Sequence, residues 1–109
     1  MRLRLSVIMP VYNGAAYLER SLAALKAGTR LPDEIIVIDD GSTDSSAAVA
    51  RGCGVRVLTA TDGRRGPAQA RNRGAAVANG EVLVFIDADV AVRPTTLAQL
   101  EQILIDQPA

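Results

Sequence analysis

Two aspartates close an apolar run in the last third of the chain. Residues 82–86 read Val-Leu-Val-Phe-Ile, and Asp87 and Asp89 follow them one residue apart. An apolar run of this length, bounded by Gly80 and by acids, predicts a strand buried on both faces of a parallel sheet. Ligands bind at the carboxyl ends of such strands. Carboxylate oxygens there suit Mg²⁺ or Mn²⁺, which usually bring a phosphate with them, although a lone Asp-x-Asp also fits a solvated turn.

Two earlier apolar runs also end in polar or acidic residues. Residues 5–11 lead into Tyr-Asn-Gly, and residues 35–38 lead into Asp-Asp-Gly. Because the carboxyl ends of parallel strands meet at one edge of the sheet, we expect these groups to converge on one site. Each group alone also fits a turn or a helix cap, since Asp, Asn and Ser favour both. The candidate binding residues at the strand ends are Pro10, Tyr12, Asn13, Asp39, Asp40 and Asp87, and the candidate metal ligands are Asp89 and Asp87.

The segment 64–73 is a local cationic patch, with arginines and no acid. Arginine forks bind phosphate bidentately, so this patch is a candidate phosphate contact. Arg71 and Arg73 lie two apart on a predicted helix and do not share a face. We therefore expect at most one of them to point toward a ligand. The alternative is a solvated helix surface.

Apolar runs and helical patterns alternate along the chain. We expect strands over residues 5–11, 35–38, 55–59 and 82–86, with the third nearer a sheet edge because its apolar residues alternate with polar ones. This alternation predicts right-handed βαβ units in a three-layer α/β sandwich, with four parallel strands in the order 3-2-1-4. The strand order then breaks between the first and fourth strands, beside Tyr12.

Capping residues give the expected helix boundaries. Leucines at helical spacing supply the apolar face of the first and last helices. The signals are Asn13 and Gly28 around the first helix, Ser42 or Thr43 and Gly52 around the second, Gly80 as the C-cap of a third helix over 67–79, and Pro94 in the first turn of the fourth.

Size and composition exclude several function classes. The chain has 109 residues, which is one domain (1–109), and its twelve basic and twelve acidic residues cancel, so no global field argues for nucleic acid. The single cysteine, Cys53, excludes an intrachain disulfide and fits a reducing compartment. The absence of histidine excludes Ser-His and Cys-His catalysis and a His-ligated metal. No apolar run approaches the roughly 18 residues of a membrane span, and we interpret the N-terminal run as a first strand.

Motifs in a fixed order give the chain a family resemblance. They are the segments 6–14, 36–44, 70–76 and 80–89. Together they resemble the N-terminal half of a family 2 glycosyltransferase with the GT-A fold, a Rossmann-like half that binds a nucleotide-diphospho-sugar. The resemblance covers almost the whole chain, and it is specific for the family but not for a substrate.

The resemblance implies a role for each strand end. Residues around Pro10 and Tyr12 would contact the nucleoside, with the aromatic ring packed on the base. Asp40 would accept a hydrogen bond from a base N–H, and Asp39 would support that strand end or the ribose. An arginine of the patch, Arg71 or Arg73 in this chain, would lie beside the nucleotide.

The same resemblance implies a metal and a reaction. Asp87 and Asp89 would hold Mg²⁺ or Mn²⁺ against the diphosphate, with Asp89 as the more direct ligand and Asp87 toward the ribose or the metal. The donor would be a UDP- or GDP-sugar, and the sugar would pass with inversion to the hydroxyl of a glycan or lipid acceptor. Such an enzyme would be bacterial and would work in the cytoplasm or at the inner face of the membrane.

The catalytic base of the family lies well past the Asp-x-Asp. Only two acids follow Asp89 here, Glu101 and Asp106, both on the last predicted helix. We therefore expect the chain to be the donor-binding half alone, truncated before the acceptor-binding half, and to transfer no sugar by itself. The alternative is a non-catalytic half-domain that binds nucleotide, or that forms a homodimer through an exposed sheet surface.

Other α/β families match less well. A two-component receiver needs a late lysine, but the only lysine is Lys26, and the acidic pair follows the second strand rather than the first. A haloacid-dehalogenase-type phosphatase carries Asp-x-Asp on its first strand and has Thr or Val where this chain has Ala91. A dinucleotide-binding fingerprint is a still weaker match, because Gly52-x-Gly54 precedes a strand instead of following one.

Overall fold

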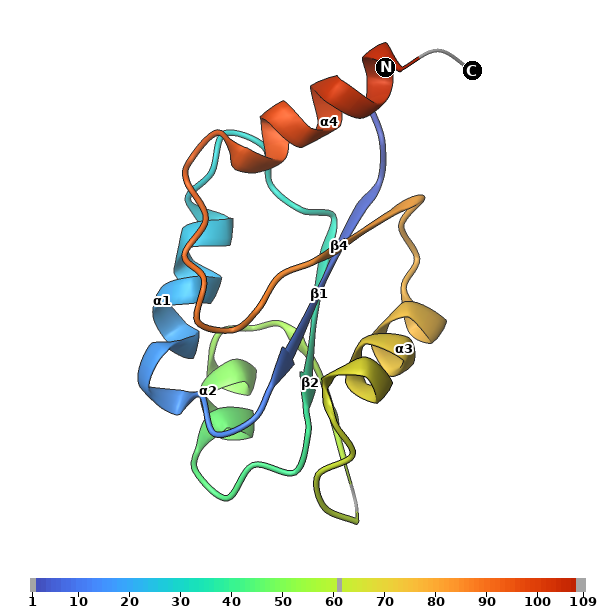
Figure 1. Ribbon diagram of the computed structural model, residues 1–109. Helices are drawn as coiled ribbons and strands as arrows, with labels where there is room; N and C mark the ends of the chain where they lie inside the picture. The colour runs from blue at the N-terminus through green and yellow to red at the C-terminus, as the bar shows by residue number, and fades with distance from the viewer. Residues whose placement is uncertain (1, 61, 108–109) are drawn as a thin grey trace.

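A computed structural model describes residues 2–60 and 62–107. Strands and helices alternate from the first element to the last (Figure 1). The elements are β1 (Leu5–Val11), α1 (Ala15–Lys26), β2 (Glu34–Asp39), α2 (Ser46–Gly52), β3 (Arg56–Thr59), α3 (Pro67–Val77), β4 (Val82–Phe85) and α4 (Thr96–Asp106).

The strands form one parallel sheet in the order β3-β2-β1-β4, as the alternation predicts. In the register, Val11 of β1 is opposite Asp39 of β2, and Ile8 is opposite Phe85 of β4. The central strand therefore extends past the end of β4 toward the same edge as the β2 end. The order breaks between β1 and β4, which is where a ligand crevice is expected in an open parallel sheet.

Helices cover both faces of the sheet, which confirms the three-layer sandwich. In Figure 1, α1 and α2 lie on one side of the strands and α3 lies on the other. Alternate residues of the central strands divide between two cores: Val7 packs with Leu22 of α1 and Leu97 of α4, whereas Ile8 packs with Ala70 of α3. Each central strand is therefore apolar on both faces.

The fourth strand differs from its prediction. β4 is at the edge of the sheet, its residues are half-buried, and Phe85 is 49% exposed. The expectation of a strand buried on both faces was wrong because, among the described residues, β4 has a hydrogen-bonded neighbour on one side only. The apolar run therefore indicates strand propensity and not burial. The buried residues of this segment are Ile86 and Ala88, which follow the strand.

Several predicted caps are also wrong. Gly14, not Asn13, is at the N-cap of α1, and α2 begins at Ser46, beyond Ser42 and Thr43. The polar side chains at these positions bond across loops instead of to their own helices. The last two boundaries shift as well: α3 is capped by Ala78 rather than by Gly80, and α4 begins at Thr96, two residues past Pro94.

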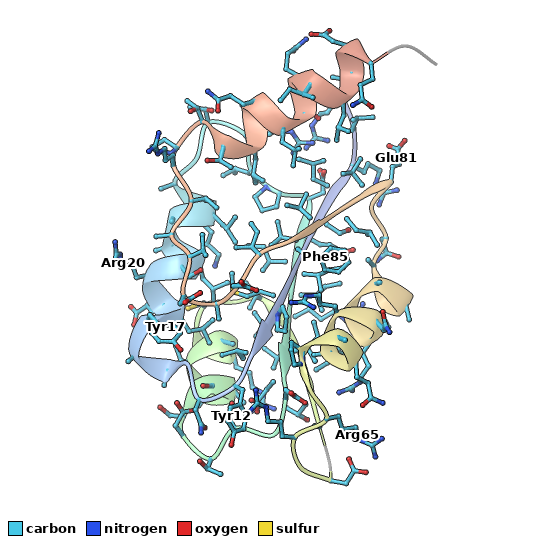
Figure 2. The ribbon with its side chains drawn as sticks, viewed as in Figure 1. Tyr12, Tyr17, Arg20, Arg65, Glu81 and Phe85 are labelled. Atoms are coloured by element: carbon cyan, nitrogen blue, oxygen red, sulfur yellow. The ribbon has the colours of Figure 1, made fainter. Side chains whose placement is uncertain are left out.

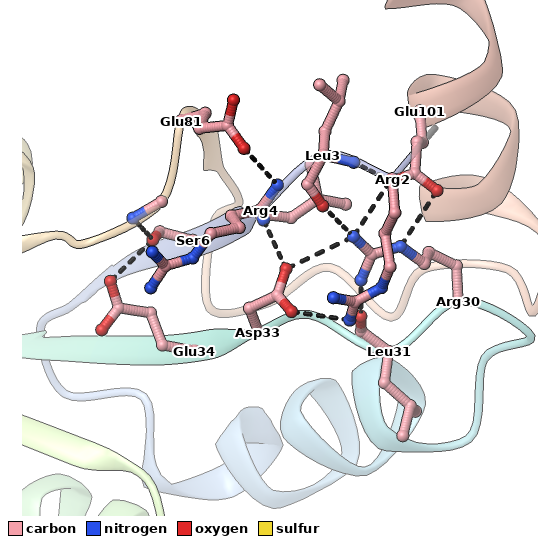
Figure 3. Close-up of polar contacts among 12 residues, drawn as sticks. Arg2, Leu3, Arg4, Ser6, Arg30, Leu31, Asp33, Glu34, Glu81 and Glu101 are labelled. Carbon is pink, nitrogen blue, oxygen red and sulfur yellow. Dashed lines mark hydrogen bonds and ion pairs between the residues drawn. The ribbon is translucent and has the colours of Figure 1, made fainter. Parts of the chain in front are cut away.

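A buried arginine ties α4 to the amino ends of the strands (Figure 3). Arg30, in the loop before β2, pairs with Glu101 of α4 at 3.0 Å and with Asp33 at 3.3 Å. It also donates to the Leu3 carbonyl oxygen, and Glu101 accepts from the Leu3 N–H at 2.9 Å. Hydrogen bonding to Glu101 raises the pKa of Arg30. This cluster fixes the end of the sheet opposite to the candidate site.

The helices described in residues 2–60 and 62–107 are all short. None of them combines the length and the apolar character that a membrane-crossing helix requires.

Candidate functional site

The carboxyl ends of β1, β2 and β4 meet at one pocket. Its volume is about 160 Å³, and it opens where the strand order breaks between β1 and β4. Figure 2 shows Tyr12 at this end of the molecule, with Glu81 at the far end of β4. The lining residues are Pro10, Val11, Tyr12, Asp40, Arg64, Pro67 and Asp87.

Asp40 is the buried anion of this pocket. It is 5% exposed, and its backbone N–H donates to the Val11 carbonyl oxygen at 2.9 Å, which continues the β1–β2 pairing. Its Oδ1 accepts from the Arg65 N–H at 2.8 Å and its Oδ2 from the Gly66 N–H at 2.9 Å. These bonds fix the carboxylate and hold the loop before α3 against the end of β2.

A glycine allows that loop to approach so closely. Gly41 has φ of +78°, and a Cβ there would lie 2.7 Å from the Arg64 backbone nitrogen and from the Gly63 carbonyl carbon. Both neighbours are backbone atoms, which cannot move away without moving the loop. The glycine of the Asp-Asp-Gly sequence is therefore a steric requirement of the pocket.

Arg64 and Tyr12 form the wall of the pocket. The guanidinium carbon of Arg64 lies 4.1 Å from the centroid of the Tyr12 ring, a cation–π geometry. The Arg64 Nε lies 3.8 Å from Asp40 Oδ2, close enough for an ion pair. Its neighbour Arg65 points elsewhere and pairs with Asp62, whose pKa the Arg65 guanidinium lowers.

Hydrogen bonds join the loop after β1 to the loop after β2. The Asn13 N–H donates to Ser42 Oγ at 2.9 Å, and Asn13 Oδ1 accepts from the Thr43 N–H at 2.8 Å. Asn13 has φ of +51°, a left-handed conformation that Asn tolerates better than most residues. Asp39 closes the second loop by accepting from the Ser42 N–H at 3.1 Å.

Ser46 and Asp44 continue this connection at the start of α2. Ser46 is fully buried, and its Oγ accepts from the Gly14 N–H at 2.9 Å. Asp44 accepts from the Ser46 hydroxyl at 2.5 Å and from the Ala15 N–H at 3.1 Å. The bond from the Ser46 hydroxyl lowers the pKa of Asp44. The two loops thus form one unit that orients Tyr12 toward the pocket.

The two acids of Asp-x-Asp lie in a tight turn after β4. The Val90 N–H donates to the Asp87 carbonyl oxygen at 3.0 Å, and both acidic residues are exposed. Asp87 lines the pocket, whereas Asp89 is not among its lining residues. Within residues 2–60 and 62–107, no group of three or more acidic, histidine or cysteine side chains is close enough to hold a metal ion.

The two candidate arginines of α3 lie on different surfaces, as their spacing predicts. Arg71 lines an apolar groove that also contains Asp87 and Phe85. Arg73 lies in a separate polar pocket and donates to the Thr59 carbonyl oxygen at 3.2 Å.

The structure brings together only part of the predicted set. Four candidates line one pocket, namely Pro10, Tyr12, Asp40 and Asp87. Five others are not among its lining residues, namely Asn13, Asp39, Arg71, Arg73 and Asp89. Arg64 also lines this pocket, and the strand-end pattern does not predict it because it lies in a loop. The available signal was its place in a Gly-Arg-Arg-Gly sequence directly before the Pro67 start of α3.

Comparisons with known proteins agree with this architecture. Residues 6–109 match the protein family described as Glycosyl transferase family 2. The chain is 36% identical over 103 residues to the glycosyltransferase GlyG of Streptococcus pneumoniae serotype 4, covering 90% of this chain and 34% of GlyG. It is 40% identical over 97 residues to the uncharacterized glycosyltransferase YibD of Escherichia coli K12, covering 84% of this chain and 28% of YibD. The chain therefore spans about a third of the length of these relatives.

Solved structures match nearly the whole chain. Glucosyl-3-phosphoglycerate synthase of Mycobacterium tuberculosis, crystallised with Mn²⁺, UDP and glucosyl-3-phosphoglycerate, matches with a TM-score of 0.81 and 30% identity, over 95% of this chain and 40% of that one. S. aureus TarS 1–349 in complex with UDP-GlcNAc matches with a TM-score of 0.87 and 27% identity, over 95% of this chain and 32% of that one.

Proposed function

The chain belongs to glycosyl transferase family 2, and from this membership we propose that residues 1–109 form a donor domain that binds a nucleotide-diphospho-sugar. The observation that carries the proposal is the convergence of Tyr12, Asp40 and Asp87 on one pocket at the break in strand order. Two structural neighbours are described in complex with UDP or UDP-GlcNAc, so UDP is the first nucleotide to test.

Each pocket residue has a defined task in this proposal. The Tyr12 ring, which is 38% exposed, offers a flat face on which a base can stack. Asp40 keeps free lone pairs beside its two backbone hydrogen bonds, so it can accept one more N–H from a base. Arg71, next to Asp87 in the adjoining groove, supplies positive charge where the diphosphate would leave the pocket.

The exposed turn of Asp87 and Asp89 could hold a divalent cation only together with ligands from outside the protein. Mg²⁺ is usually held by one or two carboxylates together with substrate phosphates and water, and two exposed carboxylates on one turn match that donor set. In this proposal Asp87 and Asp89 hold Mg²⁺ or Mn²⁺. The ion would neutralise charge on the departing nucleoside diphosphate.

In this proposal neither acid that follows Asp89 is the base for the acceptor hydroxyl. Glu101 is engaged by Arg30 and the Leu3 N–H at the opposite end of the sheet. Asp106, near the end of α4, accepts from Gln102 at 3.0 Å. The proposed reaction is inverting transfer of a sugar to an acceptor hydroxyl. In this proposal the pocket binds the sugar donor for that reaction.

Calorimetric titration tests this assignment. Wild type, Asp89→Ala and Asp40→Asn are titrated with UDP and GDP, with and without Mn²⁺, and Asp106→Ala is the control for the loss of an exposed carboxylate. We expect wild type and the control to bind one nucleotide more tightly with Mn²⁺. Asp89→Ala should lose only the metal-dependent part, and Asp40→Asn should lose binding under both conditions. A folded wild type that binds neither nucleotide contradicts the assignment.

A further inference from the structure

Arg64 occupies the place that the proposed function assigns to the nucleobase. Its guanidinium lies 4.1 Å from the Tyr12 ring centroid, and its Nε lies 3.8 Å from Asp40 Oδ2. A stacked base would use the same ring face and the same carboxylate. A guanidinium is planar and carries N–H donors on its edge, so it resembles a base with a ring N–H in shape and in the placement of its donors.

The carboxylate remains in place when Arg64 leaves. Asp40 is held by the backbone N–H groups of Arg65 and Gly66, which are independent of the Arg64 side chain. Displacing Arg64 therefore exposes a fixed acceptor and an open ring face.

The Arg64 side chain is free to move outward. It is 54% exposed, and its ion pair with Asp40 is too long to be a hydrogen bond. The Arg64 backbone nitrogen is packed close to Gly41, so the freedom belongs to the side chain and not to the loop. Arg65, in contrast, is paired with Asp62.

We propose that Arg64 is an intramolecular competitor of the nucleobase, so that a nucleotide binds only after the Arg64 side chain has left the Tyr12 ring. This inference rests on the proposed function, because it needs the base to occupy this pocket. The cation–π contact is partly exposed, and the ion pair is long at 3.8 Å and involves a guanidinium that is 54% exposed, so both are weak. The closed arrangement would therefore lower the apparent affinity by about three- to ten-fold.

Uridine separates competition for the ring from attraction to phosphate, since it has the base but no charge. NMR titrations of wild type and Arg64→Ala with uridine and with UDP, following the Tyr12 ring protons, measure both effects. Arg20→Ala is the matched control, because Arg20 is exposed and points away from the sheet on α1 (Figure 2). We expect Arg64→Ala to bind uridine about three- to ten-fold more tightly than wild type and the control.

Two results overturn the inference and leave the proposed function intact. One is equal uridine affinity in wild type and Arg64→Ala while UDP binds. The other is unchanged uridine binding with weaker UDP binding, which would make Arg64 a phosphate contact. Failure of both proteins to bind either ligand, with their folds intact, overturns the proposed function and this inference with it. Binding by Arg64→Ala alone supports both.

Discussion

Ser46 is the residue whose loss best tests how the pocket is held together. It is the first residue of α2, it is fully buried, and its hydroxyl accepts the Gly14 N–H while donating to Asp44. Ser46→Ala removes that hydroxyl and leaves a buried N–H without its partner in the loop that carries Tyr12. The Asp44 carboxylate keeps its bonds from backbone N–H groups, so the perturbation falls mainly on Gly14.

The loss of stability in Ser46→Ala follows from the burial of the Gly14 N–H. A buried donor left unsatisfied costs about 1–3 kcal/mol, and we take about 2 kcal/mol for the Gly14 N–H. Unfolding entropy of about 2.1 cal/mol/K per residue makes 1 kcal/mol worth roughly 4 °C in Tm for a chain of 109 residues. We therefore expect Ser46→Ala to lower Tm by about 8 °C.

Ser45 provides a matched control one residue away. Ser45 is exposed and makes no side-chain capping hydrogen bond, although it occupies the N-cap of α2. Ser45→Ala should leave Tm within about 2 °C of wild type, because surface substitutions rarely change stability by more than 0.5 kcal/mol. Thermal unfolding followed by far-UV circular dichroism measures both variants. Equal Tm values for the two variants would refute the reasoning, since the Ser46 hydroxyl would then contribute nothing that solvent does not replace.

Two further predictions concern backbone strain and pH. Gly54→Ala, at φ of +74° with no atom near the added Cβ, should cost about 1–2 kcal/mol of unfolding free energy. Gly41→Ala adds a clash with the Arg64 backbone, so it should cost more and also weaken UDP binding. Denaturant unfolding and UDP titration measure these effects, and equal unfolding costs for the two variants would contradict the prediction. The hydrogen bond from the Leu5 N–H lowers the pKa of Asp33 below its ordinary 3.8. The ionised Asp33 carboxylate therefore stabilises the fold above pH 3.8, and this stabilisation is lost as pH falls through the lowered pKa. The Tm difference between wild type and Asp33→Asn should therefore shrink in acid, and a constant difference would contradict the linkage.

The sheet could be predicted from the sequence because its signals are large and repeated. The apolar runs of β1 and β2 and the break in order between β1 and β4 all follow from strand and helix alternation. The burial of β4 was mispredicted because a short apolar run does not state how many neighbours a strand has. The helix-cap predictions failed for a related reason. Asn13 and Ser42 have side chains that can cap a helix, but each is hydrogen-bonded to a loop that is distant in sequence.

The candidate site was only partly visible in the sequence. Acids and an aromatic residue at strand ends identified Tyr12, Asp40 and Asp87, because parallel topology dictates where strand ends meet. The contact between Arg64 and Tyr12 depends on the path of a loop, which is set by the positive φ of Gly41 and by two backbone N–H groups on Asp40. Neither constraint has a periodic signature, so hydrophobic periodicity does not predict this contact.

The two ends of the sheet differ in how far their charged side chains are buried and paired. At the amino ends, Arg30 is 10% exposed and is enclosed by Asp33, Glu101 and carbonyl oxygens, so these charges are mutually satisfied. At the carboxyl ends, Asp87 and Asp89 remain exposed on a turn, and the Asp40 carboxylate meets a cation that is itself half-exposed. Satisfied buried charges are costly to disturb, whereas a half-exposed pair can exchange partners at little cost. That contrast is the physical reason to look for the ligand beside Tyr12 and not beside Arg30.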